Sequence, residues 1–149
     1  MLQLHEYRRL IYPLTLDAAE HPKIATIAEI ASFLAGRGNG PLVVARVPAD
    51  IMQRLGASSS WLLLSRYTAN KQKAHPEITS SSFGFLQEVL DIGERIYDRE
   101  HHAVVVQRRE KPYKAAVKVT RSGNEVYLQT FHRSDDRNIS SIKRRMGKS

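Results

Sequence analysis

The sequence predicts an α+β protein in which N-terminal helices are followed by a four-stranded antiparallel β-meander and a short basic C-terminal helix. Apolar residues recur at helical spacing in the first half, whereas four segments after residue 93 are rich in β-branched and aromatic residues. The chain has 149 residues and no long Pro/Gly/Ser-rich linker. We therefore expect one domain over residues 1–149.

The first predicted helix lies in residues 21–40, HPKIATIAEIASFLAGRGNG, which end in a glycine-rich stop. Its expected apolar face consists of Ile24, Ile27, Ile30, Ala31 and Leu34. We treat residues 1–40 as an N-terminal helical extension.

Short apolar segments follow this helix. Residues 41–48, PLVVARVP, and 60–65, SWLLLS, predict buried strands, and residues 49–56 between them have the length of two helical turns. Two more helices are predicted over residues 66–74 and 82–90.

His75 lies between those last two helices, in the segment HPEITSSS. Pro76 biases the preceding residue out of the helical region, and the serines that follow are suited to cap the next helix. We therefore expect His75 at a helix end.

The second half has the alternation and the turn sequences of a meander. The four predicted strands are residues 94–99, 101–109, 112–120 and 124–133. A last basic helix is predicted from Asp136 or Asn138, with Ile139, Ile142 and Met146 on its apolar face.

The charge is unevenly distributed along the chain. Residues 1–100 hold eleven basic and eleven acidic side chains, and residues 101–149 hold twelve Lys/Arg against four Asp/Glu, so the whole net charge of +8 lies after residue 100. This asymmetry indicates a polyanionic partner such as RNA, although a solvated basic surface would have the same composition.

Several classes of site are excluded by composition and motif. The chain has no cysteine, which excludes disulfides, thiol nucleophiles and thiolate metal sites, and its six histidines lack metal-ligand spacing. It also has no Walker A loop, dinucleotide-binding glycine motif or Gly-x-Ser-x-Gly elbow. We expect no metal and no cofactor.

The sequence also bears on where the protein works. It contains neither an apolar run of eighteen residues nor a secretory signal. We therefore expect no membrane partner and a cytoplasmic location.

The remaining histidines, lysines, arginines and hydroxyl residues suit metal-free RNA cleavage, which needs a base, an acid and cations. On the last predicted strand, Thr130 and His132 share a face with Val126 and Leu128. On the strand before it, Lys114, Ala116, Lys118 and Thr120 share a face. Each polar residue also has a structural interpretation: Thr130 favours β-structure, and His132 can end a strand.

Residues 62–79, LLLSRYTANKQKAHPEIT, and 113–145, YKAAVKVTRSGNEVYLQTFHRSDDRNISSIKRR, resemble phage-associated members of the barnase, EndoU, colicin and RelE-like (BECR-fold) nuclease superfamily. The common features are a Ser-x-x-Thr segment leading to His-Pro-Glu and a final strand ending in Thr-Phe-His-Arg. The resemblance covers residues 41–148, which it implies to be the nuclease core. It also implies RNA as substrate, no metal, and a toxin-like or phage-encoded protein in a bacterial host cell.

The resemblance implies roles for individual residues. By position, His75, Thr130 and His132 are the implied catalytic residues, and the implied substrate-binding residues are Ser65, Arg66, Lys111, Lys114 and Arg133. An imidazole exchanges protons near neutral pH, which suits general acid and base catalysis. The alternative is that His75 and Glu77 only terminate a helix.

Three functions are consistent with the sequence. The first is a metal-independent endoribonuclease that uses 2′-hydroxyl attack with histidine acid and base, held in check by an acidic inhibitor such as an immunity or antitoxin protein. The second is an inactive RNA- or DNA-binding module. The third is a phage structural or host-takeover protein that kept the fold.

Overall fold

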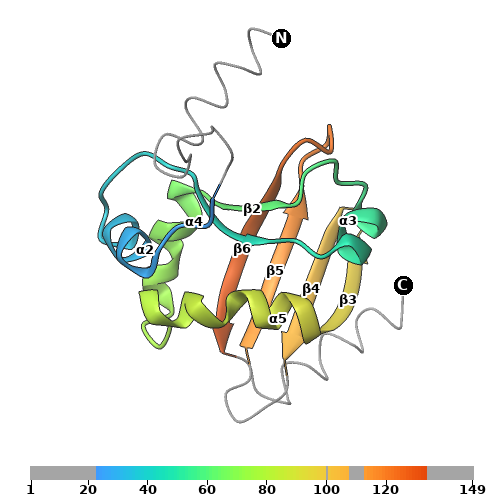
Figure 1. The fold of residues 1–149 in the computed structure, drawn as a ribbon. Coiled ribbons are helices and arrows are strands. Elements are labelled where there is room, and N and C mark those ends of the chain that lie inside the picture. The colour runs from blue at the N-terminus through green and yellow to red at the C-terminus, as the bar shows by residue number, and fades with distance from the viewer. Residues whose placement is uncertain (1–22, 100, 108–112, 134–149) are drawn as a thin grey trace, which may run out of the picture.

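The computed structural model describes residues 23–99, 101–107 and 113–133. Figure 1 shows helices and strands interleaved around one sheet. In chain order the elements are α2 (Ile27–Leu34), β1 (Leu42–Arg46), α3 (Ala49–Leu55), β2 (Trp61–Leu64), α4 (Arg66–Lys71), the 3₁₀ helices η1 (Gln72–Ala74) and η2 (Ser80–Phe85), α5 (Leu86–Ile92), β3 (Glu94–Arg99), β4 (His102–Gln107), β5 (Tyr113–Val119) and β6 (Val126–Arg133). The predicted α+β class is confirmed.

The described sheet is larger than predicted. Its six strands have the order β1-β2-β6-β5-β4-β3; β3 to β6 pair antiparallel in succession, β2 pairs parallel with β6, and β1 pairs antiparallel with β2. The predicted four-stranded antiparallel meander is present as β3 to β6 after the described helices, but the prediction that it forms the whole sheet was wrong, because β1 and β2 extend it into a six-stranded mixed sheet. Residues 62–64 of β2 are all buried. The backbone N–H and C=O groups of such a buried strand need hydrogen-bond partners on neighbouring strands, and β6 provides these partners on one side of β2.

Helix α2 is shorter than the predicted segment, and its apolar face is different. Thr26 accepts a hydrogen bond from the Glu29 N–H, the Glu29 carboxylate accepts one from the Thr26 N–H, and this capping box starts the helix at Ile27. Ile30 and Phe33 are buried, whereas Ile24 and Ile27 are exposed. Of the predicted face, Ile30 and Leu34 pack in the core as expected, whereas Ile24, Ile27 and Ala31 do not, and Ile24 lies ahead of the cap, where helical periodicity does not apply.

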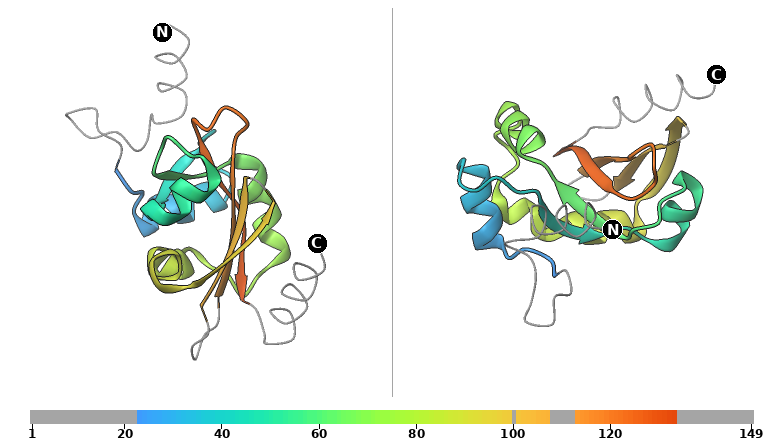
Figure 2. Two further views of the ribbon diagram at one scale, coloured as in Figure 1. Left: turned by 90° about the vertical axis from the view of Figure 1, so that its right-hand side faces the viewer. Right: turned by 90° about the horizontal axis from the view of Figure 1, so that it is seen from above.

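The main core lies between one face of the sheet and helices α2, α3 and α5. Figure 2 shows α5 and α4 on opposite sides of strands β3 to β6. The predicted helix over residues 82–90 is in fact a 3₁₀ turn, η2, followed by α5. On the sheet face opposite α5, a small apolar cluster consists of Ile96, Val104, Val106 and Ala116.

A β-bulge in β6 changes which residues share a face. Ala116 pairs with Thr130 but Val117 pairs with Leu128, so Gln129 is an extra residue without a partner on β5. The bulge places Leu128 and Phe131 in the core, and Thr130 and His132 on the opposite face. The shared face of Thr130 and His132 is confirmed, but its predicted continuation to Val126 and Leu128 was wrong, because the bulge reverses the alternation.

Some predictions fall on residues that the structure does not describe. Lys111, residues 1–22 of the predicted extension and the predicted basic helix after residue 135 lie outside the described ranges. Within the described part of the chain, none of the helices has both the length and the apolar character needed to cross a bilayer.

Candidate active site

His75 is held at the end of a helical segment, as the sequence predicts. The Ser65 hydroxyl caps α4 by accepting from the Thr68 N–H at 3.1 Å, and α4 continues into η1, which ends at Ala74. The His75 N–H donates to the Gln72 carbonyl, and the His75 carbonyl accepts from the Ile78 N–H, both at 2.9 Å. These two bonds fix a tight turn around Pro76.

His132 reaches the same place from the sheet. It lies near the end of β6, opposite Lys114 on β5, and its side chain lies on the face away from α5. The bulge at Gln129 produces this orientation, because without it His132 would share the core face with Leu128.

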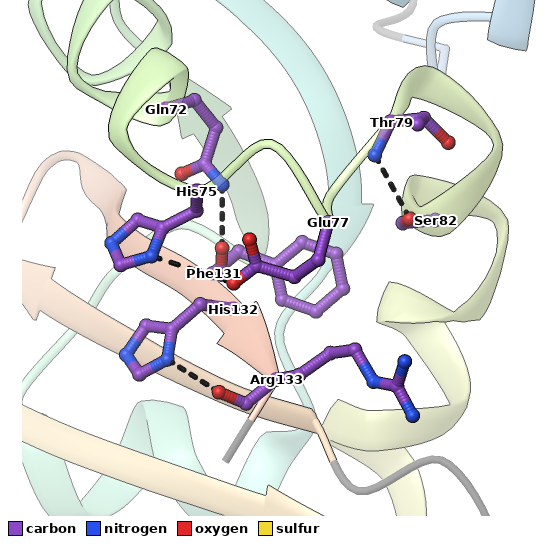
Figure 3. A network of polar contacts seen from close by, with 8 residues as sticks. All are labelled: Gln72, His75, Glu77, Thr79, Ser82, Phe131, His132 and Arg133. Carbon is purple, nitrogen blue, oxygen red and sulfur yellow. Dashed lines mark hydrogen bonds and ion pairs between the residues drawn. The ribbon is translucent and has the colours of Figure 1, made fainter.

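The two imidazole rings stack. Their centroids are 4.7 Å apart, and the ring planes differ by only 11° (Figure 3). Parallel stacking at this distance is within the range of favourable aromatic pairs. Two like-charged imidazolium rings would repel each other, so the geometry favours a pair in which at most one ring is charged.

Each ring has a polar partner at Nδ1. His75 Nδ1 lies 3.6 Å from Glu77 Oε1, and His132 Nδ1 lies 2.8 Å from the carbonyl oxygen of Arg133. Because a carbonyl oxygen can only accept, neutral His132 has its proton on Nδ1 and a free lone pair on Nε2. Figure 3 shows that the Nε2 edges of both rings point the same way, away from these partners.

The surroundings of His132 favour its neutral form. Burial is the largest cause that lowers its pKa, and the charges of Lys114 and His75 lower it further. The hydrogen bond to the Arg133 carbonyl and the charge of Glu77 raise the pKa but do not compensate. The result is a histidine whose pKa lies below the ordinary 6.5.

A buried glutamine connects the two elements that carry the histidines. Gln72 Nε2 donates to the carbonyl oxygen of Phe131 at 2.5 Å, and both residues are buried. Gln72 precedes His75 by one turn, and Phe131 directly precedes His132. On the other side of Glu77, the Thr79 N–H donates to the Ser82 hydroxyl at 3.0 Å (Figure 3).

Of the other residues implied by the resemblance, some lie on the same sheet face as the histidine pair and others lie elsewhere in the fold. Lys114 and Thr130 share the sheet face of His132. Arg133 follows His132 and is exposed. Ser65 lies at the opposite end of the α4–η1 segment from His75, where its hydroxyl caps the helix.

Arg66 is engaged in holding α2. Its guanidinium lies 3.8 Å from the centroid of the Phe33 ring and donates to the carbonyl of Phe33 at 2.6 Å. It also donates to the carbonyls of Arg37 and Gly38, beyond the end of the helix. These contacts direct Arg66 to the C-terminal end of α2 and not to the histidine pair.

The contacts of Gln72 and Glu77 are not predictable from the sequence. Glu77 follows His75 by two residues across Pro76, so the sequence places its carboxylate near the ring without showing that it contacts Nδ1. Gln72 is three residues before His75 and therefore on the same helical side, but its bond to Phe131 joins residues far apart in sequence. No pattern of neighbouring residues in the sequence predicts such a hydrogen bond.

Comparison with protein-family models, curated proteins and solved structures finds no match for this chain. Within the described residues, no three His, Cys, Asp or Glu side chains form a group suited to hold a metal ion. The described site thus consists of two stacked imidazoles, a carboxylate beside one of them and a lysine beside the other.

Proposed function

We propose that this protein is a metal-independent endoribonuclease that cleaves RNA by attack of a ribose 2′-hydroxyl on the adjacent phosphate. The observation that carries the proposal is the stacked pair of His75 and His132, whose Nε2 edges point to the same side. The pair is assembled from two distant elements and secured by a buried hydrogen bond between Gln72 and Phe131. If His75 only ended a helix, it would not need to stack on His132.

The reaction needs two proton transfers at one phosphate. A base removes the proton of the 2′-hydroxyl, and an acid protonates the departing 5′-oxygen. These two oxygens are attached to the same phosphorus at the transition state, so the groups that serve them must lie close together. Two imidazoles with parallel, neighbouring Nε2 edges meet that requirement.

The surroundings suggest which histidine has which role. His132 is the base, because its lowered pKa keeps it neutral near pH 7 and its Nδ1 proton is directed to Arg133, leaving Nε2 as a proton acceptor. His75 is the acid, because the Glu77 carboxylate at 3.6 Å can balance the charge of its protonated ring. Lys114, on the strand next to His132, provides positive charge for the phosphorane.

Labelled RNA incubated with the pure protein in EDTA tests the proposal. The wild-type protein should leave 2′,3′-cyclic phosphate ends, and an RNA with one 2′-deoxy nucleotide should resist cleavage at that site. His75→Ala and His132→Ala should each lower cleavage roughly 10²–10⁴-fold, with a smaller effect on binding of a 2′-deoxy strand. Lys23→Ala, an exposed cation ahead of α2, is the control and should cleave normally.

Two results would contradict the proposal. Wild-type cleavage by either folded histidine variant would remove the pair from catalysis. RNA that binds the wild-type protein but stays intact would instead favour the inactive nucleic-acid-binding module.

A further inference from the structure

A groove with a mixed polar and apolar lining lies on the same side of the sheet as His132. It has a volume of about 900 Å³ and is bounded by the start of α4 and by the connected ends of β5 and β6. Its lining includes Ser65, Tyr67, Lys118, Thr120, Arg121 and Gln129. This volume is at the upper end of the range of small-molecule sites, about 300–1,000 Å³.

The groove and the histidine pair are connected along the sheet. On β5, Lys118 lines the groove and Lys114 lies beside His132, four residues away and on the same face. At the rise of a β-strand this separation is roughly 13 Å, which corresponds to about two nucleotides of an extended single strand. A single strand with its cleaved phosphate at the histidines is therefore long enough to reach the groove.

The side chains of the groove are suited to a nucleotide. Tyr67 is 72% exposed, an unusual state for a large aromatic residue, and its ring lies 5.2 Å from Lys71 Nζ. Lys118 and Arg121 are also exposed, and neither side chain forms a hydrogen bond or ion pair with another described residue. An aromatic surface combined with available cations is the usual composition of a single-strand binding site, where bases stack and phosphates meet positive charge.

Other lining residues of the groove are held in place. The Tyr127 hydroxyl donates to Glu125 Oε2 at 3.0 Å, and His101 Nδ1 lies 3.0 Å from the Leu55 carbonyl oxygen. The turn between β5 and β6 is anchored as well, because Ser58 donates from both its N–H and its hydroxyl to the Gly123 carbonyl. A groove with fixed walls requires little reorganisation to accept a ligand.

We propose that this groove is a subsite for single-stranded RNA, in which Tyr67 stacks on a base about two nucleotides from the cleaved phosphate and Lys118 and Arg121 contact the phosphates between. The proposal rests on the proposed ribonuclease function for its substrate. It adds a recognition site, remote from the chemistry, that distinguishes longer strands from dinucleotides.

The binding test uses the full chain and a fluorescent all-2′-deoxy strand of roughly eight nucleotides, which cannot be cleaved by 2′-hydroxyl attack. Tyr67→Ala should weaken binding of this strand roughly 5- to 100-fold, the usual loss for one stacked base. Tyr67→Phe keeps the ring and should bind like the wild type, and Lys23→Ala is the matched surface control. Unchanged binding by Tyr67→Ala, or no binding by the wild type, would overturn the subsite.

The cleavage test separates this inference from the proposed function. Tyr67→Ala should raise KM for a longer RNA and leave kcat/KM for a dinucleotide unchanged. If Tyr67→Ala cleaves both substrates like the wild type, the subsite is wrong and the ribonuclease stands. If the wild type cleaves neither but binds the deoxy strand through Tyr67, the ribonuclease is wrong and the groove stands as a nucleic-acid site.

Discussion

At the scale of single residues, His132 is the group whose surroundings most affect the proposed chemistry. It is part of the stacked pair, and it faces Lys114, His75 and Glu77 while its Nδ1 is held by the Arg133 carbonyl. Burial and positive neighbours disfavour its charged form. A histidine in this state is a base already prepared at neutral pH.

The acidic limb of the pH–rate profile tests this state. A base must be deprotonated, so kcat/KM should rise as the pH rises through the lowered pKa of His132, and its midpoint should lie below pH 6.5. Lys114→Met removes one of the charges that lower this pKa, so the limb should move to higher pH. Lys23→Met should leave the limb in place, and an unmoved limb in Lys114→Met would contradict the electrostatic role of Lys114.

At the scale of elements, the bond between η1 and β6 is expected to align the two histidines. Gln72→Met preserves the length of the side chain but removes its donor to the Phe131 carbonyl, which leaves a buried acceptor unpaired at a cost of about 1–3 kcal/mol. We expect a lower kcat with a smaller change in KM, because the rings lose their alignment while the groove is kept. Cleavage kinetics of a short RNA measure this.

Gln87→Met is the matched control for Gln72. Gln87 also bridges distant backbone, since it accepts from the Arg46 N–H and donates to the Arg46 carbonyl, but it lies on α5, which is on the other side of the sheet from the histidines. This variant should lose stability without losing kcat. An equal fall of kcat in both variants would indicate a general effect on folding and not positioning by Gln72.

The turn between β5 and β6 depends on a close backbone approach. Gly123 has φ +81°, and a Cβ there would lie 2.6 Å from the carbonyl oxygen of Gly56. Gly36 has φ +100° but open space around it. Both Gly→Ala changes incur backbone strain of about 1–2 kcal/mol, and only Gly123→Ala adds a steric clash.

Urea unfolding should therefore show that Gly123→Ala is the more destabilising of the two changes. Because the same turn borders the proposed subsite, the folded variant should also bind the deoxy strand more weakly. Equal losses of unfolding free energy for both variants would mean that the turn moves away from Gly56 at no cost.

At the scale of the whole molecule, the excess positive charge lies in the part of the chain that supplies the sheet strands of the proposed sites. The net charge of +8 arises after residue 100, and four of the basic residues there, Lys114, Lys118, Arg121 and Arg133, belong to the described sheet and its turn. The affinity for a nucleic-acid single strand should fall as the salt concentration rises, because a protein that neutralises phosphates releases counterions.

Salt dependence can be assigned to individual lysines. For a single strand, each lost phosphate contact should reduce the slope of log K against log salt by roughly 0.7. Lys114→Gln and Lys118→Gln should each lower the slope by about this amount, and the double variant by about twice as much. Lys23→Gln should not change it, and binding independent of salt would contradict a phosphate-binding surface.

Local patterns in the sequence were sufficient for much of the fold. The apolar runs around Leu62–Leu64 and the alternation in β5 identify strands, and Pro76 places His75 at the end of a helical segment. These signals depend only on neighbouring residues, which is why they are readable without the fold. The same reasoning identified Thr130 and His132 as sharing a face, since both follow the bulge.

Contacts between residues far apart in the sequence determined the remaining features of the fold and of the site. The addition of β1 and β2 to the edge of β6, the use of Arg66 to hold α2, and the bond from Gln72 to Phe131 all join residues distant in sequence. The bulge at Gln129 likewise depends on how β6 pairs with β5. Because it interrupts the alternation of side chains along β6, alternation alone assigns Val126 and Leu128 to the wrong face. By itself the sequence determined which segments form helices and strands and supplied two histidines. The tertiary structure decided that the two rings stack, because packing of the α4–η1 segment against β6 brings them together.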